Sequence, residues 1–215
     1  MGAFLFQMKW YWIKTSQLVK WLFRKYIWDI PTSDKIVYLT FDDGPTPKIT
    51  PWVLDQLDTY QAKATFFCIG DNIRKFPEIY HEVNARGHQI GNHTYHHLNG
   101  WKTGSQKYID DALLWETIAE SQNKLFRPPY GKIKSRQAQN LMQSGYKMIM
   151  WDVLSADFDP SINPETCLEN VIKNIQPGSI VVFHDSVKAF KNLEHALPQT
   201  LRYLKENGYE CAGID

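Results

Sequence analysis

The fold is decided by residues 35–45, which read KIVYLTFDDGP. The segment from Ile36 to Phe41 is apolar, β-branched and aromatic with almost no polar alternation, which is typical of a strand buried on both faces in a parallel sheet. Gly44 and Pro45 then take the chain out of the sheet, because glycine tolerates unusual backbone angles and proline has no N–H for the ladder. Two carboxylates, Asp42 and Asp43, are therefore left at a strand end, where α/β enzymes place their chemistry.

Short apolar strands alternate with amphipathic helices along the rest of the chain. Further strands are predicted at 64–69, 89–91, 124–126, 146–152 and 179–183, with helices at 47–60, 71–76, 77–86, 105–121, 134–143, 164–174 and 188–206. Such alternation requires a parallel sheet with helical crossovers, and about seven such units favour closure into a (β/α) barrel over an open sheet.

Length and composition limit the functions that the chain can have. At 215 residues it can form one domain with a sizeable core, predicted at 34–215, preceded by an N-terminal extension at 1–33. The formal net charge is only +1, so the composition gives no indication of a nucleic-acid partner. The three cysteines are widely spaced and indicate buried thiols, and residues 1–7 are too short for a convincing secretory signal. We expect a cytoplasmic monomer with a neutral substrate.

Residues 8–30 interleave aromatic and basic side chains. Leu18, Leu22 and Tyr26 fall at helical spacing, which predicts an amphipathic helix with a basic face. One interpretation is a helix that packs against the barrel and closes its bottom, and the common periodicity of surface helices favours it. The other is peripheral contact of this segment with an anionic membrane surface.

Side chains that can bind metals or transfer protons follow several of the predicted strands. Asp42 and Asp43 follow the first strand and His93 and His97 the third, while later strands are followed by Arg127, Asp152, Asp157, His184 and Asp185. In a barrel the carboxyl ends of the strands share one rim, so residues far apart in the sequence should surround a single pocket.

A metal site is the first hypothesis for this rim. His93 and His97 are four residues apart, so on a helical turn both imidazoles would face one ion, while His96 would point elsewhere. One carboxylate of the pair Asp42 and Asp43 would complete a set of two histidines and an acid, and an ion there would lower the pKa of bound water from 15.7 to about 7.

The remaining groups would complete a hydrolytic site. The second aspartate of the pair could accept a proton, and His184 could protonate a leaving group from another part of the rim. Arg127 could hold the base in its ionised form by charge pairing.

Four linked motifs resemble the polysaccharide deacetylase family, also called the NodB homology domain or carbohydrate esterase family 4. They are TFDDG at 40–44, HTYHH at 93–97, RPPY at 127–130 and SIVVFH at 179–184, and the resemblance spans about residues 35–210. It implies an α/β fold, a distorted (β/α)7–8 barrel of the NodB type with its active site at the C-terminal rim of the strands. The implied activity is removal of N-linked acetyl groups from N-acetylglucosamine-containing poly- or oligosaccharides.

The resemblance also implies a role for each motif residue. Asp43, His93 and His97 correspond to the ligands of a divalent metal, usually Zn²⁺, with Co²⁺ or another divalent ion as alternatives. By the same resemblance, Asp42 is the catalytic base, Arg127 is the partner of that base and His184 is the general acid. The Tyr130 backbone N–H would donate to the oxyanion, and Val182 would line the acetyl pocket. The implied partner is an N-acetylated carbohydrate.

The chain departs from the family in a fifth segment, Leu154-Ser155-Ala156-Asp157-Phe158, where members commonly carry Asp-x-x-Asp-Trp. Asp157 is present and is expected to tune His184. Leu154 and Phe158 replace the acid and the tryptophan, so we expect altered substrate contacts there rather than altered metal chemistry.

Three other functions fit parts of the pattern. A hydrolase of a small non-sugar amide or cyclic imide would use the same residues on the same fold. A metal-binding barrel that binds sugar without turnover would not need Asp42, Arg127 and His184. A non-haem iron oxygenase also uses two histidines and a carboxylate, but it needs neither Asp42 nor His184.

Overall fold

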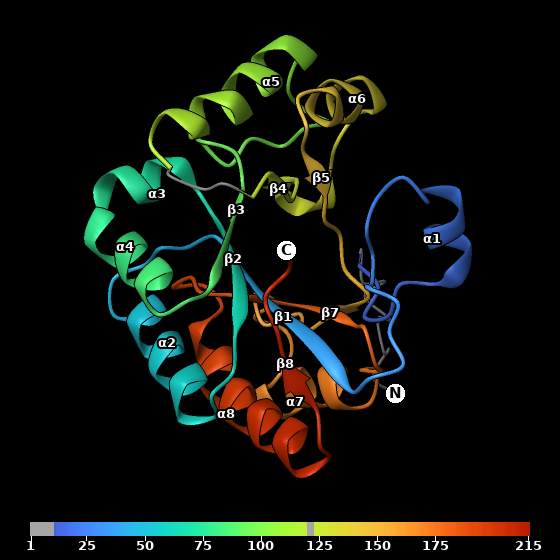
Figure 1. The fold of residues 1–215 in the computed structure, drawn as a ribbon, viewed down its shortest axis with the longest axis vertical. Helices are drawn as coiled ribbons and strands as arrows, with labels where there is room; N and C mark the ends of the chain where they lie inside the picture. Colours follow the sequence, from blue (N-terminus) through green and yellow to red (C-terminus); the bar gives the residue numbers. More distant parts are fainter. Residues whose placement is uncertain (1–10, 120–122) are drawn as a thin grey trace, which may run out of the picture.

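A curled sheet of parallel strands surrounded by helices forms the body of the protein in the computed structural model, which describes residues 11–119 and 123–215 (Figure 1). The strand order is β5-β4-β3-β2-β1-β7-β6, and β8 pairs with the first part of β1. The strands are β1 (Ile36–Asp42), β2 (Ala64–Cys68), β3 (Gln89–Asn92), β4 (Leu125–Phe126), β5 (Lys147–Met148), β6 (Val153–Leu154), β7 (Ile180–His184) and β8 (Glu210–Cys211). The prediction of a distorted (β/α) barrel is confirmed.

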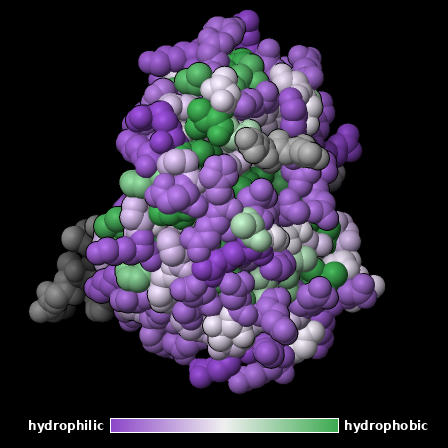
Figure 2. Space-filling model, turned by 60° about the vertical axis from the view of Figure 1, so that its left-hand side comes forward, coloured by the Kyte–Doolittle hydropathy of each residue, from purple (hydrophilic) through white to green (hydrophobic). Residues whose placement is uncertain are grey.

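Helices connect the strands and cover the outside of the sheet. They are α1 (Gln17–Leu22), α2 (Ile49–Thr59), α3 (Gly70–Lys75), α4 (Pro77–Ala85), α5 (Ser105–Leu114), α6 (Ser135–Gln143), α7 (Pro164–Ile172) and α8 (Phe190–Glu206), with 3-10 turns η1 (Trp115–Thr117) and η2 (Pro129–Gly131). The face that carries α3 and α4 is mainly hydrophilic, with apolar residues in small groups, as expected for helices that bury only one side (Figure 2).

β1 lies inside the sheet, between β2 and β7. Phe41 is fully buried and its ring stacks on Phe66 of β2 at 5.0 Å and on Phe183 of β7 at 6.0 Å between centroids. Burying each such side chain contributes about 1.5–3 kcal/mol to the free energy of folding. The stacked phenylalanines therefore stabilise the arrangement of β1 between β2 and β7. The register brings Asp42 level with His184, and the ends of β1 and β7 therefore deliver both side chains to one place.

The predicted strand at 146–152 is wrong in its extent. Two short strands, β5 and β6, lie on either side of a gap that the N-terminal segment fills. Ile27 donates its N–H to Met148 O at 2.8 Å and accepts that of Met150 at 2.7 Å, while Ile13 accepts the Leu154 N–H at 2.8 Å. Residues 11–30 therefore supply backbone partners that the barrel strands lack at this point.

The helix predicted within residues 8–30 is also shorter than its periodicity suggests. Only Gln17–Leu22 is helical, Tyr26 follows the helix end, and Thr15 is buried with its hydroxyl donating to Trp151 O. The segment packs against the barrel: Thr15 lies against its wall, and the Ile30 N–H donates to Gly178 O at 2.9 Å beside the amino end of β7. Residues 1–10 of the predicted extension lie outside the described part. No helix in the described part is long and apolar enough to cross a membrane.

Candidate active site

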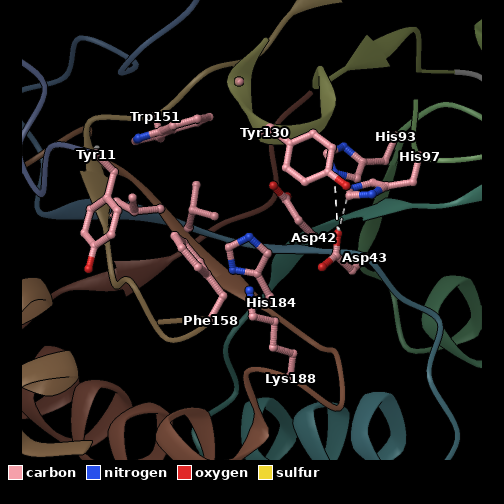
Figure 3. Close-up of a pocket in the computed structure, with 13 residues that line it drawn as sticks. Tyr11, Asp42, Asp43, His93, His97, Tyr130, Trp151, Phe158, His184 and Lys188 are labelled. Carbon is pink, nitrogen blue, oxygen red and sulfur yellow. Dashed lines mark ion pairs between the residues drawn. The ribbon is translucent and has the colours of Figure 1, made fainter. Parts of the chain in front are cut away.

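A pocket of about 300 Å³ opens where the carboxyl ends of the strands meet (Figure 3). Nine of the eleven predicted site residues line it, namely Asp42, Asp43, His93, His97, Tyr130, Leu154, Phe158, Val182 and His184. The other two, Arg127 and Asp157, are buried directly behind lining residues and contact them. Residues from five separate segments therefore converge at one rim, as the barrel topology requires.

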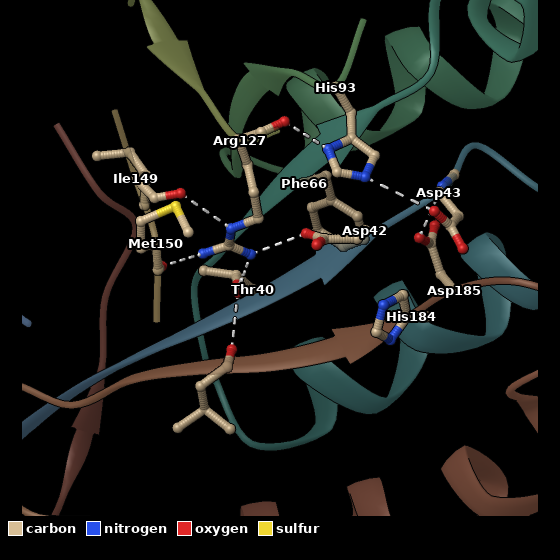
Figure 4. Close-up of polar contacts among 12 residues, drawn as sticks. Thr40, Asp42, Asp43, Phe66, His93, Arg127, Ile149, Met150, His184 and Asp185 are labelled. Atoms are coloured by element: carbon tan, nitrogen blue, oxygen red, sulfur yellow. Dashed lines mark hydrogen bonds and ion pairs between the residues drawn. The ribbon is translucent and has the colours of Figure 1, made fainter. Parts of the chain in front are cut away.

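Asp42 is held by a fully buried arginine (Figure 4). Arg127 donates to Asp42 Oδ1 at 2.8 Å and to the Thr40 hydroxyl at 2.6 Å, and its other nitrogens donate to the carbonyls of Ile149 and Met150. Burial lowers the pKa of Arg127, an effect that the charge of Asp42 opposes. Because each guanidinium nitrogen has a partner, the Asp42 carboxylate is fixed in one orientation.

The three predicted metal ligands lie together. The Nε2 atoms of His97 and His93 are 3.2 Å and 3.7 Å from Asp43 Oδ1, and the three ligand atoms are all within 4.8 Å of one another. His93 Nδ1 lies 2.8 Å from the Arg127 carbonyl, which can only accept a hydrogen bond, so Nδ1 carries the proton and Nε2 carries the lone pair that faces Asp43. Burial lowers the pKa of His93 to about 4, which keeps the ring neutral. Two imidazoles and one carboxylate fit a divalent cation.

The two histidines do not lie on a helical turn, contrary to the prediction. Thr94 and His97 have positive φ angles of 62° and 56°, and these reverse the chain so that both rings face Asp43. Asn92 fixes the turn by accepting the Thr94 N–H at 2.8 Å. Buried Asp111 accepts the backbone N–H of His96 and contacts its ring, so His96 points away from the site, as expected.

Asp43 is positioned by the buried carboxylate of Asp185, whose role the sequence does not reveal. Asp185 accepts the Gly44 N–H at 3.0 Å and the Thr50 hydroxyl. A Cβ at Gly44 would lie 2.1 Å from an oxygen of Asp185, so only glycine fits beside this carboxyl. Asp43 itself has φ 81°, and its carbonyl accepts the Asn72 side chain at 2.8 Å. Burial raises the pKa of Asp185 to about 7.

His184 is oriented by Asp157, which lies outside the pocket. The two carboxylate oxygens accept the backbone N–H of His184 at 2.7 Å and contact its Nδ1 at 2.8 Å. Burial alone lowers the pKa of His184, but the nearby charges of Asp157, Asp43 and Asp42 outweigh it and raise the pKa to about 9. The ring therefore carries a proton at neutral pH with Nε2 free to face the pocket.

The rest of the pocket is apolar and aromatic. Leu154 and Val182 form part of one wall, and the Phe158 ring meets His184 edge-on at 5.1 Å. Tyr130 has φ 61°, is half exposed and places its ring 4.6 Å from that of His97. Among the described residues its backbone N–H has no hydrogen-bond partner. This wall can accept a small apolar group beside a free N–H donor.

Four lining residues are not predicted by the sequence, namely Tyr11, Gly131, Trp151 and Lys188. Tyr11 comes from the N-terminal segment, meets Phe158 edge-on at 5.5 Å and donates its hydroxyl to Asp159. Figure 3 shows Tyr11, Trp151 and Phe158 on the side of the pocket away from Asp43. No local motif marks Tyr11, because its place depends on contacts more than a hundred residues away. Asp152, a polar residue noted at a strand end, lies outside the pocket.

A parallel barrel whose strand ends carry a paired aspartate and arginine, a histidine-aspartate pair and a cluster of ligand groups defines an α/β-barrel hydrolase. The sequence profile of the family described as polysaccharide deacetylase matches residues 29–149. The chain belongs to this family and is a hydrolase acting on carbon–nitrogen bonds other than peptide bonds.

Relatives in sequence and in structure agree with this assignment. A peptidoglycan-N-acetylglucosamine deacetylase of Bacillus cereus is 38% identical over 194 residues, which cover 87% of this chain and 90% of the relative. A peptidoglycan-N-acetylmuramic acid deacetylase of Bacillus subtilis is 30% identical, with 86% of this chain and 72% of the relative covered. A crystal structure of a peptidoglycan N-acetylglucosamine deacetylase superimposes with a TM-score of 0.82 at 31% identity, covering 91% of this chain and 94% of that one.

Proposed function

We propose that the protein is a metal-dependent deacetylase that removes N-linked acetyl groups from N-acetylglucosamine-containing poly- or oligosaccharides. The observation that carries this proposal is the convergence of Asp43, His93 and His97 within 4.8 Å, directly beside an aspartate that a buried arginine holds. The names of the relatives, which are deacetylases of peptidoglycan sugars, support the substrate class.

Asp43, His93 and His97 would hold the divalent cation, with Zn²⁺ as the first expectation from two nitrogen ligands and one oxygen ligand. When bound, such a cation supplies Lewis acidity, which polarises an amide carbonyl and lowers the pKa of water. The ligand groups are preorganised, because the Arg127 carbonyl fixes the tautomer of His93 and Asp185 fixes the backbone turn at Asp43.

Asp42 and His184 divide the proton transfers. Asp42 accepts a proton from the attacking water as the C–O bond forms, and Arg127 holds its carboxyl group in one orientation. His184 donates a proton to the nitrogen as the C–N bond breaks, because an amine leaves as a neutral group and not as an anion. The products are acetate and a free amino sugar, and the proton balance closes when Asp42 and His184 return to their starting states.

The remaining lining residues place the acetamide group. The free Tyr130 N–H can donate to the carbonyl oxygen as negative charge develops on it. Leu154 and Val182 offer apolar area to the acetyl methyl, and Phe158 stands where a sugar ring would pass His184. The presence of both Asp42 and His184 also argues against a barrel that binds sugar without turnover, because such a protein needs neither a base nor an acid.

The test is acetate release from N-acetylglucosamine oligomers, peptidoglycan and simple amides or cyclic imides by the same preparation. Chelation should abolish sugar deacetylation, and added zinc or cobalt should restore it. Full activity of metal-stripped protein would contradict the metal dependence. Cleavage of simple amides or imides with no release from the sugars would move the protein to the small-amide hydrolases of this fold.

A further inference from the structure

Helix α1 has its polar and apolar sides reversed relative to an ordinary surface helix. None of its residues is buried, and Leu18, Trp21 and Leu22 are exposed by 65%, 66% and 59%. These three residues lie at i, i+3 and i+4, so they form one continuous outward surface, which we call the α1 apolar face. A helix that packs on a barrel would turn these residues inward.

A charged residue occupies the inward side of α1 instead. The Lys20 side chain is only 9% exposed and donates to the fully buried Asp152 at 2.6 Å and to Asp29. Lys14 donates to the other oxygen of Asp152 at 2.5 Å, and the Ser179 hydroxyl donates to Asp152 as well. An isolated six-residue helix is not stable in water, so this ion cluster holds α1 in its orientation.

The exposed apolar side chains gather in this segment. Of the nine large hydrophobic residues that are exposed in the described part of the chain, five fall within residues 12–23. Figure 1 shows α1 standing out beside the barrel, whereas the face over α3 and α4 is mainly hydrophilic (Figure 2). Such a concentration on a monomer marks an interaction surface rather than ordinary surface variation.

We propose that the α1 apolar face binds the surface of an anionic lipid membrane. Arg24 and Lys25 follow the helix directly and are exposed, and no acidic residue occurs between residues 15 and 28. Leucine and tryptophan beside exposed cations match the boundary between headgroups and acyl chains, where tryptophan is favoured and cations meet anionic headgroups. A charged protein partner would not need the apolar face. An apolar protein partner would make no favourable contact with Arg24 and Lys25.

This contact is independent of the proposed reaction. The α1 apolar face includes none of the residues that line the catalytic pocket. Loss of membrane binding would therefore leave deacetylation of soluble oligomers unchanged, and failure of the deacetylase assay would leave the membrane contact standing.

The test is co-sedimentation of the full chain with vesicles of phosphatidylcholine, with and without phosphatidylglycerol. The double variant Trp21→Ser/Leu22→Ser should bind anionic vesicles at least about tenfold more weakly, because two large side chains no longer enter the bilayer. The variant Arg24→Gln/Lys25→Gln should lose roughly fivefold per cation on anionic vesicles only, and added salt should weaken the parent in the same way. Leu114→Ser/Val187→Ser removes exposed apolar residues elsewhere and should bind like the parent.

Three results would overturn the proposal. The first is vesicle binding by Trp21→Ser/Leu22→Ser that equals binding by the parent. The second is a melting temperature that falls in this variant, since exposed residues should be replaceable without cost and a fall would show that the face covers core. The third is a dimer in sedimentation velocity that the same variant abolishes while neither protein binds vesicles, which would assign the face to a second copy of the chain.

Discussion

Replacing Asp157 by Asn should move the alkaline limit of activity downward. Asp157 is completely buried, and its carboxylate lies 2.8 Å from His184 Nδ1. Two unit charges about 4 Å apart interact by roughly 4 kcal/mol at an effective dielectric constant of about 20. At about 1.4 kcal/mol for each pKa unit, loss of this attraction lowers the pKa of His184 by up to about 3 units. The asparagine keeps the shape and one hydrogen bond of the aspartate, so the change is mainly one of charge.

The sign follows from the role of His184 as an acid. A proton donor works while it is protonated, so activity is present below its pKa and is lost as the pH rises through it. The parent limit near the pKa of about 9 should fall toward the ordinary histidine value of about 6.5 in Asp157→Asn. The assay is the pH profile of kcat/KM for acetate release from a soluble oligomer. Asp159→Asn is the matched control, since it removes a charge from the same loop and that charge is not among the main causes that raise the pKa of His184. An unchanged limit in Asp157→Asn, or an equal shift in both variants, would refute the reasoning.

Three further predictions concern single groups. Asp42→Asn should lower kcat by about 10² to 10⁴ with the metal content of the protein unchanged, and loss of metal would mean that the two acids have exchanged roles. Leu154→Asp should alter the ranking of chito-oligomers against smaller N-acetyl substrates with little effect on the pH limits, whereas a large shift of either limit would place this position in the catalytic charge network. Lys14→Met/Lys20→Met leaves Asp152 buried without a cation, which costs about 3–5 kcal/mol of stability and should lower the melting temperature by at least about 6 °C. Adding Asp152→Asn should recover most of this loss. An unchanged melting temperature in the double variant would contradict the stabilising role of the two lysines.

The barrel and its rim were predictable because their determinants are local. The apolar run that ends at Phe41 defines a buried parallel strand, and the GP step after Asp43 ends it. Once strands and helices alternate, topology alone brings the strand ends to one rim, so His93 and His184 could be assigned to one pocket without knowledge of their distance. Their chemical types then limited the site to metal binding and proton transfer.

Features that depend on backbone angles or on distant partners were not predictable. A positive φ at Thr94 leaves no mark in the residue type, so the sequence predicts a helical turn where the chain reverses. The division of the strand at 146–152 depends on Ile27, whose backbone groups take the place of a neighbouring strand. Asp185 was visible at a strand end, but its role requires the contact with Gly44, which only the folded chain provides.

The orientation of α1 shows why periodicity alone cannot locate a helix face. Leu18, Trp21 and Leu22 form the same stripe whether they face a core or a lipid surface, so the sequence admits both interpretations. Lys20 decides between them, because a buried lysine is tolerated only where an acid neutralises it. That acid is Asp152, which lies 132 residues away along the chain. Because this ion pair turns Lys20 toward the barrel, it turns the apolar stripe outward, and a single long-range contact thereby converts a helix with a packing pattern into an exposed binding surface.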